Sequence, residues 1–218
     1  MRFTVDAEDA RARMVRRQLR RRGIGDERVL AAMERVPREL FVPPKLRRHA
    51  YADGALPIGH GQTISQPLMV ATICSLLELA GCERVLDVGT GSGYQAAVLA
   101  ELAVEVVTVE RVPELADAAR EALAEAGYER IEVVVGDGSV GVPERAPFDA
   151  IAIAAAAPAM PPALYEQLVD RGRLVVPLGS RRGQELVVAV KTGEGPRMRV
   201  SVPCRFVPLL GDEGFVHV

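Results

Sequence analysis

The stretch Val-Leu-Asp-Val-Gly-Thr-Gly-Ser-Gly-Tyr at residues 85–94 constrains the fold more than any other part of the chain. An apolar run typical of a β-strand leads into Gly89, Gly91 and Gly93, and an Ala-rich helical pattern follows. Glycine permits positive φ angles and a close approach of the backbone to a ligand. The first amides of a helix donate to polar or anionic groups. The pattern therefore predicts a strand, a tight turn and a helix, with a ligand at the turn.

The chemistry of that ligand follows from two acidic residues. The glycine spacing is G-x-G-x-G rather than the G-x-G-x-x-G of dinucleotide sites, and Asp87 would repel a pyrophosphate. S-adenosylmethionine carries an amino group and a sulfonium, so it suits a nearby carboxylate. A second apolar run, Val104–Val109, ends at Glu110, which is placed to accept both ribose hydroxyls. We favour an S-adenosylmethionine site over a βα turn that binds nothing.

The rest of the chain alternates between strand and helix patterns. Such alternation predicts an α/β fold with a mostly parallel, doubly wound sheet, helices on both faces and a terminal antiparallel hairpin. Ligands bind at the carboxyl ends of such strands, where Asp87, Glu110 and Asp137 would converge. Asp137 or its neighbouring backbone would meet the adenine, although a role limited to the turn stays open. Later strands are expected at 131–135, 148–154, 172–178, 184–191 and 198–207, and helices at 113–126 and 162–168.

A glycine-rich, uncharged stretch, 57–69, precedes an apolar helix that is expected to end near Gly81. Pro67 suits a first helical turn, with Ser65 or Gln66 near the N-cap. Ser65 has two interpretations, one as a simple cap and one as a hydroxyl that holds a carboxylate at the helix start. His60 is either a base or an uninvolved loop residue.

Composition limits the function classes. The 218 residues are 49% hydrophobic with net charge −2, which suits one domain and argues against a polyanionic partner.

We expect an N-terminal helical segment and active-site loop at 1–66, with helices at 9–22 and 26–36 and a loop at 41–57. A core that binds S-adenosylmethionine, with C-terminal strands that contact the substrate, is expected at 67–218. The arginines of residues 9–22 are either a solvated face or a nucleic-acid patch. Without an apolar run of about eighteen residues or a C-x-x-C pair, we expect a cytoplasmic protein with reduced cysteines, no membrane contact and no metal.

Several motifs together resemble the protein-L-isoaspartate (D-aspartate) O-methyltransferase family over nearly the whole chain. The glycine motif fits many methyltransferases, whereas Thr-Ile-Ser-Gln-Pro at 63–67 with Val-Pro-Leu at 207–209 is much narrower. The other matching stretches are 136–138, 146–151 and 172–179. The resemblance implies a class I S-adenosylmethionine-dependent methyltransferase that repairs isoaspartyl-containing proteins and peptides. Its product would be S-adenosyl-L-homocysteine plus a methyl ester that collapses to a succinimide. Separately, we expect a monomer.

The resemblance also implies roles for individual residues. Ser65 would be the catalytic serine and would contact the substrate together with Val207 and Pro208. Leu210 stands where some members have a threonine that reaches the cofactor. The implied cofactor-binding residues are Gln62, Thr63, Ile64, Asp87, Gly89, Gly91, Gly93, Glu110, Asp137, Gly138 and Ser139.

Two other functions stay open. One is a methyltransferase for RNA or a small molecule, but the Ala-Ala-Ala-Pro segment at 155–158 lacks an aromatic side chain to stack on a base. The other is a module that binds the cofactor without turnover, which the intact 63–65 and 207–209 stretches argue against.

Overall fold

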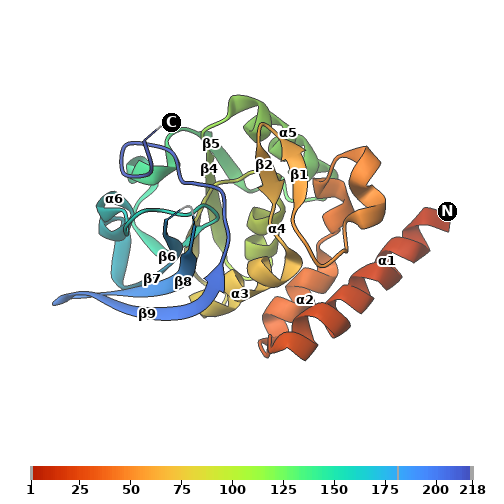
Figure 1. The fold of residues 1–218 in the computed structure, drawn as a ribbon, viewed down its shortest axis with the longest axis horizontal. Helices are drawn as coiled ribbons and strands as arrows, with labels where there is room; N and C mark the ends of the chain where they lie inside the picture. Colours follow the sequence, from red (N-terminus) through yellow and green to blue (C-terminus); the bar gives the residue numbers. More distant parts are fainter. Residues whose placement is uncertain (1, 181, 217–218) are drawn as a thin grey trace.

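The computed structural model describes residues 2–180 and 182–216, which form a twisted sheet with helices against its faces (Figure 1). Within that part of the chain the large sheet has seven strands in the order β5-β4-β3-β6-β7-β8-β9. Strands β3 to β7 are parallel, and β8 and β9 close the sheet as an antiparallel hairpin. The seven are β3 Arg84–Val88, β4 Glu105–Glu110, β5 Glu132–Val135, β6 Phe148–Ile153, β7 Leu168–Gly179, β8 Gln184–Thr192 and β9 Gly195–Cys204. The predicted fold class is confirmed.

Alternating side chains of the central strands divide between two cores. Val85 of β3 packs in the larger core, whereas its neighbour Leu86 packs in the other. This is the two-residue period of a strand that is buried on both faces. The helices are α1 Arg2–Met14, α2 Glu27–Arg35, α3 Pro67–Leu77, α4 Tyr94–Ala100, α5 Pro113–Glu125 and α6 Pro162–Glu166.

The helices cover the two faces unequally. α3, α4 and α5 lie on one side of the sheet in Figure 1, with α1 and α2 outside them. The other side has α6, short turns and the chain around Leu209. The N-terminal helices share a single core with α3 and the sheet, because Leu19, Leu30 and Ile73 belong to the same buried cluster.

Several helices begin or end at the residues that the sequence pattern predicts. Asp26 caps α2 by accepting hydrogen bonds from the Arg28 and Val29 amides. Pro113 opens α5, and Gly23 ends the first helical segment with a positive φ of 95°. That segment is helical as predicted, but it starts earlier and changes to a π turn at Val15–Leu19 and a 3₁₀ turn at Arg20–Arg22.

Some expected boundaries were wrong. The expected loop at 41–57 contains the 3₁₀ turn Pro44–His49 and the start of a hairpin, β1 Leu56–Gly59 with β2 Gln62–Ile64. The predicted helix at 162–168 ends at Glu166, because β7 begins at Leu168. The last strand ends at Cys204, so residues 205–207 leave the sheet and run towards the carboxyl ends of the parallel strands.

Across residues 2–180 and 182–216, every helix is too short or too polar to cross a membrane. The same residues hold no group of three or more His, Cys, Asp or Glu side chains that could bind a metal ion.

Candidate functional site

The glycine turn after β3 forms the floor of the candidate site. Gly89, Gly91 and Gly93 have φ angles of 93°, 52° and 86°, a region that side chains with a Cβ rarely adopt. The Gly89 amide donates to the Val109 carbonyl (2.9 Å), which ties the turn to the end of β4. The turn therefore presents backbone at the carboxyl edge of the sheet, as the sequence predicted.

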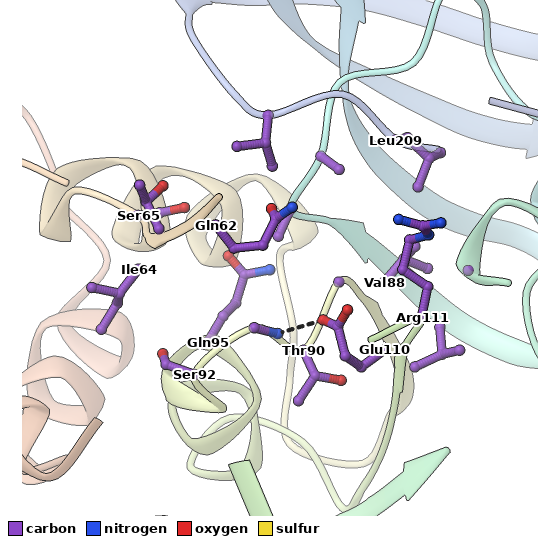
Figure 2. A pocket seen from close by; sticks show the side chains of 18 of the residues that line it. Gln62, Ile64, Ser65, Val88, Thr90, Ser92, Gln95, Glu110, Arg111 and Leu209 are labelled. Carbon is purple, nitrogen blue, oxygen red and sulfur yellow. Dashed lines mark hydrogen bonds between the residues drawn. The ribbon is translucent and has the colours of Figure 1, made fainter. Parts of the chain in front are cut away.

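Glu110 ends β4 beside this turn. Its Oε2 accepts from the Gly91 amide (2.9 Å) and its Oε1 accepts from the Val112 amide (3.0 Å). Figure 2 shows the first of these bonds at the base of the pocket. The two bonds fix the carboxylate, and each oxygen keeps a lone pair for a further donor. Glu110 lines the pocket, so it can accept two hydroxyls of a bound ribose.

Asp87 lies deeper and is fully buried. Gln95 Nε2 donates to its Oδ1 (2.8 Å), and Thr108 Oγ1 donates to its Oδ2 (2.9 Å). Burial raises the pKa of Asp87 to about 6, although these two hydrogen bonds act in the opposite direction. Gln95 itself lines the pocket and stands between Asp87 and the open space.

The segment between β2 and α3 forms the opposite wall. Gln62, Thr63, Ile64 and Ser65 all line the pocket. The N-cap of α3 is Gln66, and no side chain caps this helix, so the interpretation of Ser65 as a simple cap is wrong. In Figure 2, Ser65 lies on one side, Glu110 on the other, and Gln62 and Gln95 between them.

A buried arginine supports Ser65 from behind. Arg38 donates through Nη2 to the Ser65 carbonyl (2.8 Å) and through Nε to the Ala50 carbonyl (2.7 Å). Its guanidinium lies 4.7 Å from the centre of the Tyr94 ring, at the start of α4. The side chain is fully buried, and burial lowers its pKa. Arg38 therefore connects the Ser65 segment to the helix that follows the glycine turn.

The segment after β9 completes the wall. The Ala156 amide donates to the Val207 carbonyl (2.8 Å), and the Leu209 amide donates back to the Ala156 carbonyl (2.7 Å). Residues 207–209 thus run as an extra extended segment beside the loop after β6. No hydrogen bond to the Val207 amide occurs among the described residues.

These walls enclose a cleft whose empty space is about 810 Å³, part of it open to solvent. The predicted residues that line it are Gln62, Thr63, Ile64, Ser65, Gly89, Gly91, Glu110, Gly138, Val207 and Pro208. Four others lie outside the lining, namely Asp87, Gly93, Asp137 and Ser139. Gly93 packs where an added Cβ would lie 3.1 Å from Leu123 Cγ, and Asp137 and Ser139 bind each other and the C-terminal segment.

A second cavity of about 680 Å³ adjoins the cleft. Thr63, Ser65, Val207 and Ala154 line both spaces. Its other walls come from Gln66, Met69 and residues 203–206, among others. Ser65 and Val207 therefore stand where the two cavities meet, and a group on a ligand in one space can reach a ligand in the other.

The sequence reasoning missed several lining residues. Thr90, Ser92, Gln95, Arg111 and Leu209 all face the cleft. Gln95 carried a usable signal, because it is the one amide side chain in the apolar helix that follows the glycine turn. Arg38 carried none, since nothing in its neighbourhood in the sequence marks it as buried. His60 sits at the exposed tip of the β1–β2 hairpin and does not line the cleft.

Comparison with known proteins identifies related chains. A family model described as protein-L-isoaspartate(D-aspartate) O-methyltransferase matches residues 10–214. A protein-L-isoaspartate O-methyltransferase from Methanoculleus marisnigri is 57% identical over 206 residues, covering 94% of this chain and 93% of that protein. Another from Marinobacter nauticus is 55% identical over 212 residues, covering 96% and 97%.

Two solved structures are also similar. One, named protein-L-isoaspartate O-methyltransferase, superposes with a TM-score of 0.83 at 28% identity, covering 94% of this chain and 67% of that chain. The second is a candidate protein-L-isoaspartate O-methyltransferase from Plasmodium falciparum in complex with S-adenosyl-L-homocysteine. Its TM-score is 0.81 at 26% identity, covering 92% and 98%.

Proposed function

The chain belongs to the protein-L-isoaspartate (D-aspartate) O-methyltransferase family, and we propose that its two adjoining cavities carry out that family's reaction with Ser65 at their junction. The reaction transfers the methyl group of S-adenosylmethionine to the free carboxylate of an isoaspartyl or D-aspartyl residue. The observation that supports this proposal is that Ser65 and Val207 line both cavities, so that both residues can contact the cofactor in one and the substrate in the other.

The larger cleft fits the nucleoside cofactor. Glu110 is anchored by two backbone amides and faces the ribose position. Gln62, Thr63, Ile64, Gly89, Gly91 and Gly138 form the remaining proposed contacts. Asp87 acts through Gln95, whose side chain it orients. When bound, S-adenosylmethionine supplies an electrophilic methyl group on a positively charged sulfur.

The second cavity fits the isoaspartyl segment of a protein. The free α-carboxylate has a pKa near ~3.5, so it is ionised at neutral pH and needs no general base. Ser65 donates a hydrogen bond that orients this carboxylate, and among the described residues no protein group occupies its hydroxyl. The Val207 amide, where the two spaces meet, guides the peptide backbone together with Pro208, which lines the larger cleft. Recognition through the backbone suits loose selection of side chains.

The main contribution of the protein is geometry. Holding two reacting groups about 3–3.5 Å apart lowers a barrier by roughly 7–11 kcal/mol. The β1–β2 hairpin, with positive φ at Gly59, His60 and Gly61, is placed to cover both ligands and exclude water. The methyl ester that forms then loses methanol when the next backbone nitrogen attacks it, which gives the succinimide.

Methyl transfer to matched peptides tests the proposal. Labelled S-adenosylmethionine is incubated with one isoaspartyl peptide and the same peptide with a normal aspartate. We expect base-labile label on the isoaspartyl peptide alone. Equal labelling of both peptides, or none while S-adenosyl-L-homocysteine still binds, would move the assignment to a different acceptor or to a binding module.

The partner and compartment assignments are further proposals. We propose that the protein acts as a monomer. The net charge of −2 and the Ala-Ala-Ala-Pro segment at 155–158 support an enzyme that takes no nucleic acid. Three free cysteines support a reducing cytoplasm. Light scattering tests the monomer, competition of RNA with the peptide substrate tests the exclusion of nucleic acid, and cell fractionation tests the compartment.

A further inference from the structure

The C-terminal segment from Gly211 to Glu213 returns to the turn that follows β5. The Asp212 amide donates to Asp137 Oδ2 (2.8 Å), and the Glu213 amide donates to Ser139 Oγ (3.0 Å). Asp137 Oδ1 accepts hydrogen bonds from the Ser139 amide (2.8 Å) and the Ser139 hydroxyl (2.7 Å). Both oxygens of Asp137 are therefore engaged by protein, one within its own turn and one by the C-terminal segment.

Further bonds hold the segment in a defined shape. The Gly214 amide donates to the Gly211 carbonyl (3.1 Å) and closes a turn. Glu213 Oε2 accepts from the Ala163 amide (2.8 Å), and the Phe215 amide donates to the Leu209 carbonyl (2.7 Å). We name residues 211–213 with Asp137 and Ser139 the C-terminal clasp.

Gly211 shows how closely the two parts of the clasp approach. A Cβ at this position would lie 2.0 Å from Asp137 Oδ1 and 2.4 Å from Ser139 Oγ. Neither atom can retreat easily, because Asp137 and Ser139 are bonded to each other and Ser139 is fully buried. This close approach to Asp137 and Ser139 therefore requires a glycine at position 211.

The clasp fixes part of the cleft wall. Leu209 and Leu210 line the cleft directly before the clasp, and Gly138 lines it from the turn that the clasp grips. Leu209 is held on its other side by the Ala156 carbonyl (2.7 Å). The distance between these leucines and Gly138 is thus set by bonds outside the cleft.

We propose that the C-terminal clasp is a positioning device that closes the nucleoside end of the cleft, and that Asp137 is the residue through which the turn after β5 holds the C-terminal segment. The clasp keeps Leu209 and Leu210 against the face of a bound purine. Asp137 serves this role as an anion, because the hydrogen bonds from the Asp212 amide and from Ser139 outweigh burial and lower its pKa. This inference rests on the proposed function for the identity of the ligand.

The test is to delete the hydrogen bond from the Asp212 amide to Asp137 while Asp137 and Ser139 keep their side chains. Asp212 occupies the second position of the Gly211–Gly214 turn, where proline is well tolerated, and Asp212→Pro removes its amide N–H. Asp212→Ala is the matched control, since it keeps the amide. Calorimetry with S-adenosyl-L-homocysteine measures affinity, and steady-state kinetics measure the KM of each substrate.

We expect Asp212→Pro to weaken S-adenosyl-L-homocysteine binding about ten- to a hundredfold, as loss of one hydrogen bond to a charged acceptor would. The KM for S-adenosylmethionine should rise equally, while kcat and the peptide KM stay within twofold. Asp212→Ala should bind as the wild type does. Wild-type binding by a folded Asp212→Pro would overturn the clasp, as would an equal loss in both variants.

A second pair of variants covers the case in which the proline variant does not fold. Ser139→Ala removes the bond to Glu213 and should shift binding in the same direction. In an Asp137→Ala background, Ser139→Ala should add little to the loss, and additive losses would contradict the clasp. Binding to S-adenosyl-L-homocysteine does not depend on the acceptor, so failure of methyl transfer in the wild type would reject the proposed function and leave this test intact.

Discussion

Arg38→Lys tests whether the buried arginine positions Ser65. Arg38 makes hydrogen bonds of 2.7 and 2.8 Å to the Ala50 and Ser65 carbonyls. Lysine keeps the charge but carries a single nitrogen, so it reaches at most one of these carbonyls. Losing one hydrogen bond from a charged donor costs about 1.5–3 kcal/mol of unfolding free energy. In a chain of this size that lowers Tm by roughly 3–12 °C.

The effect on activity should exceed what lost stability explains. Once its carbonyl is released, the Ser65 segment shifts at the junction of the two cavities, and a misplacement of about 1 Å costs up to about 100-fold in rate. We expect kcat/KM for an isoaspartyl peptide to fall about 10- to 100-fold. S-adenosyl-L-homocysteine should bind with nearly unchanged affinity, because Arg38 does not line the cleft.

Arg28→Lys provides a matched control. Arg28 also donates to two carbonyls, those of Leu79 and Leu102, but it is exposed. It contacts the chain beyond the C-terminal end of α3, whereas Ser65 precedes the N-terminal end of that helix. Its replacement should lower Tm without changing peptide kinetics, with assays run well below either Tm. If Arg38→Lys melts lower but keeps wild-type kcat/KM, or if both variants lose equal activity, the positioning argument is wrong.

Three other substitutions probe the cleft. Ser65→Ala should lose most methyl transfer and keep S-adenosyl-L-homocysteine affinity within twofold by calorimetry; wild-type turnover would refute the role of its hydroxyl. Glu110→Gln should weaken S-adenosylmethionine binding about tenfold through a weaker acceptor at the ribose, and unchanged affinity would place the ribose elsewhere. The folded-state pKa of Asp87 is raised to about 6 from 3.8, so its contribution to stability falls as pH rises across this window. Asp87→Asn should therefore gain stability relative to wild type between about pH 4 and 6, by about 3 kcal/mol in total. Denaturant titrations at each pH measure the difference, and a pH-independent difference would contradict the buried charge.

The sequence predicted the parts of the fold that local patterns determine. The strands ending at Asp87–Val88 and Glu110 were identifiable because apolar runs buried on both faces end at glycine or acidic residues. Hairpin β1–β2 was missed because its strands are too short for a periodic signal, and contacts such as Ile58 near Gly91 help to hold it in place.

The sequence predicted part of the site, because those residues also lie beside local patterns. Ser65, Glu110 and Val207 line the cleft as expected, since each follows or precedes a recognisable motif. Arg38 is buried under the site, and its partners are distant in the sequence, so composition gives no indication of it. The contacts of Asp137 with Asp212 likewise join positions far apart in the chain, and no spacing rule predicts them.

The cleft wall draws its residues from Gln62 in the hairpin to Leu210 near the clasp. No contiguous fragment that lacks either end of this interval carries a complete binding surface, so affinity for the nucleoside reports on the whole fold. Because a ligand that binds only the native state stabilises it by mass action, saturation at about 100 times Kd adds about 2.7 kcal/mol. The cellular concentration of S-adenosylmethionine would then determine the lifetime of this enzyme against proteolysis as well as its rate. A cell short of methyl donor would therefore contain less of the enzyme, and each remaining molecule would work more slowly.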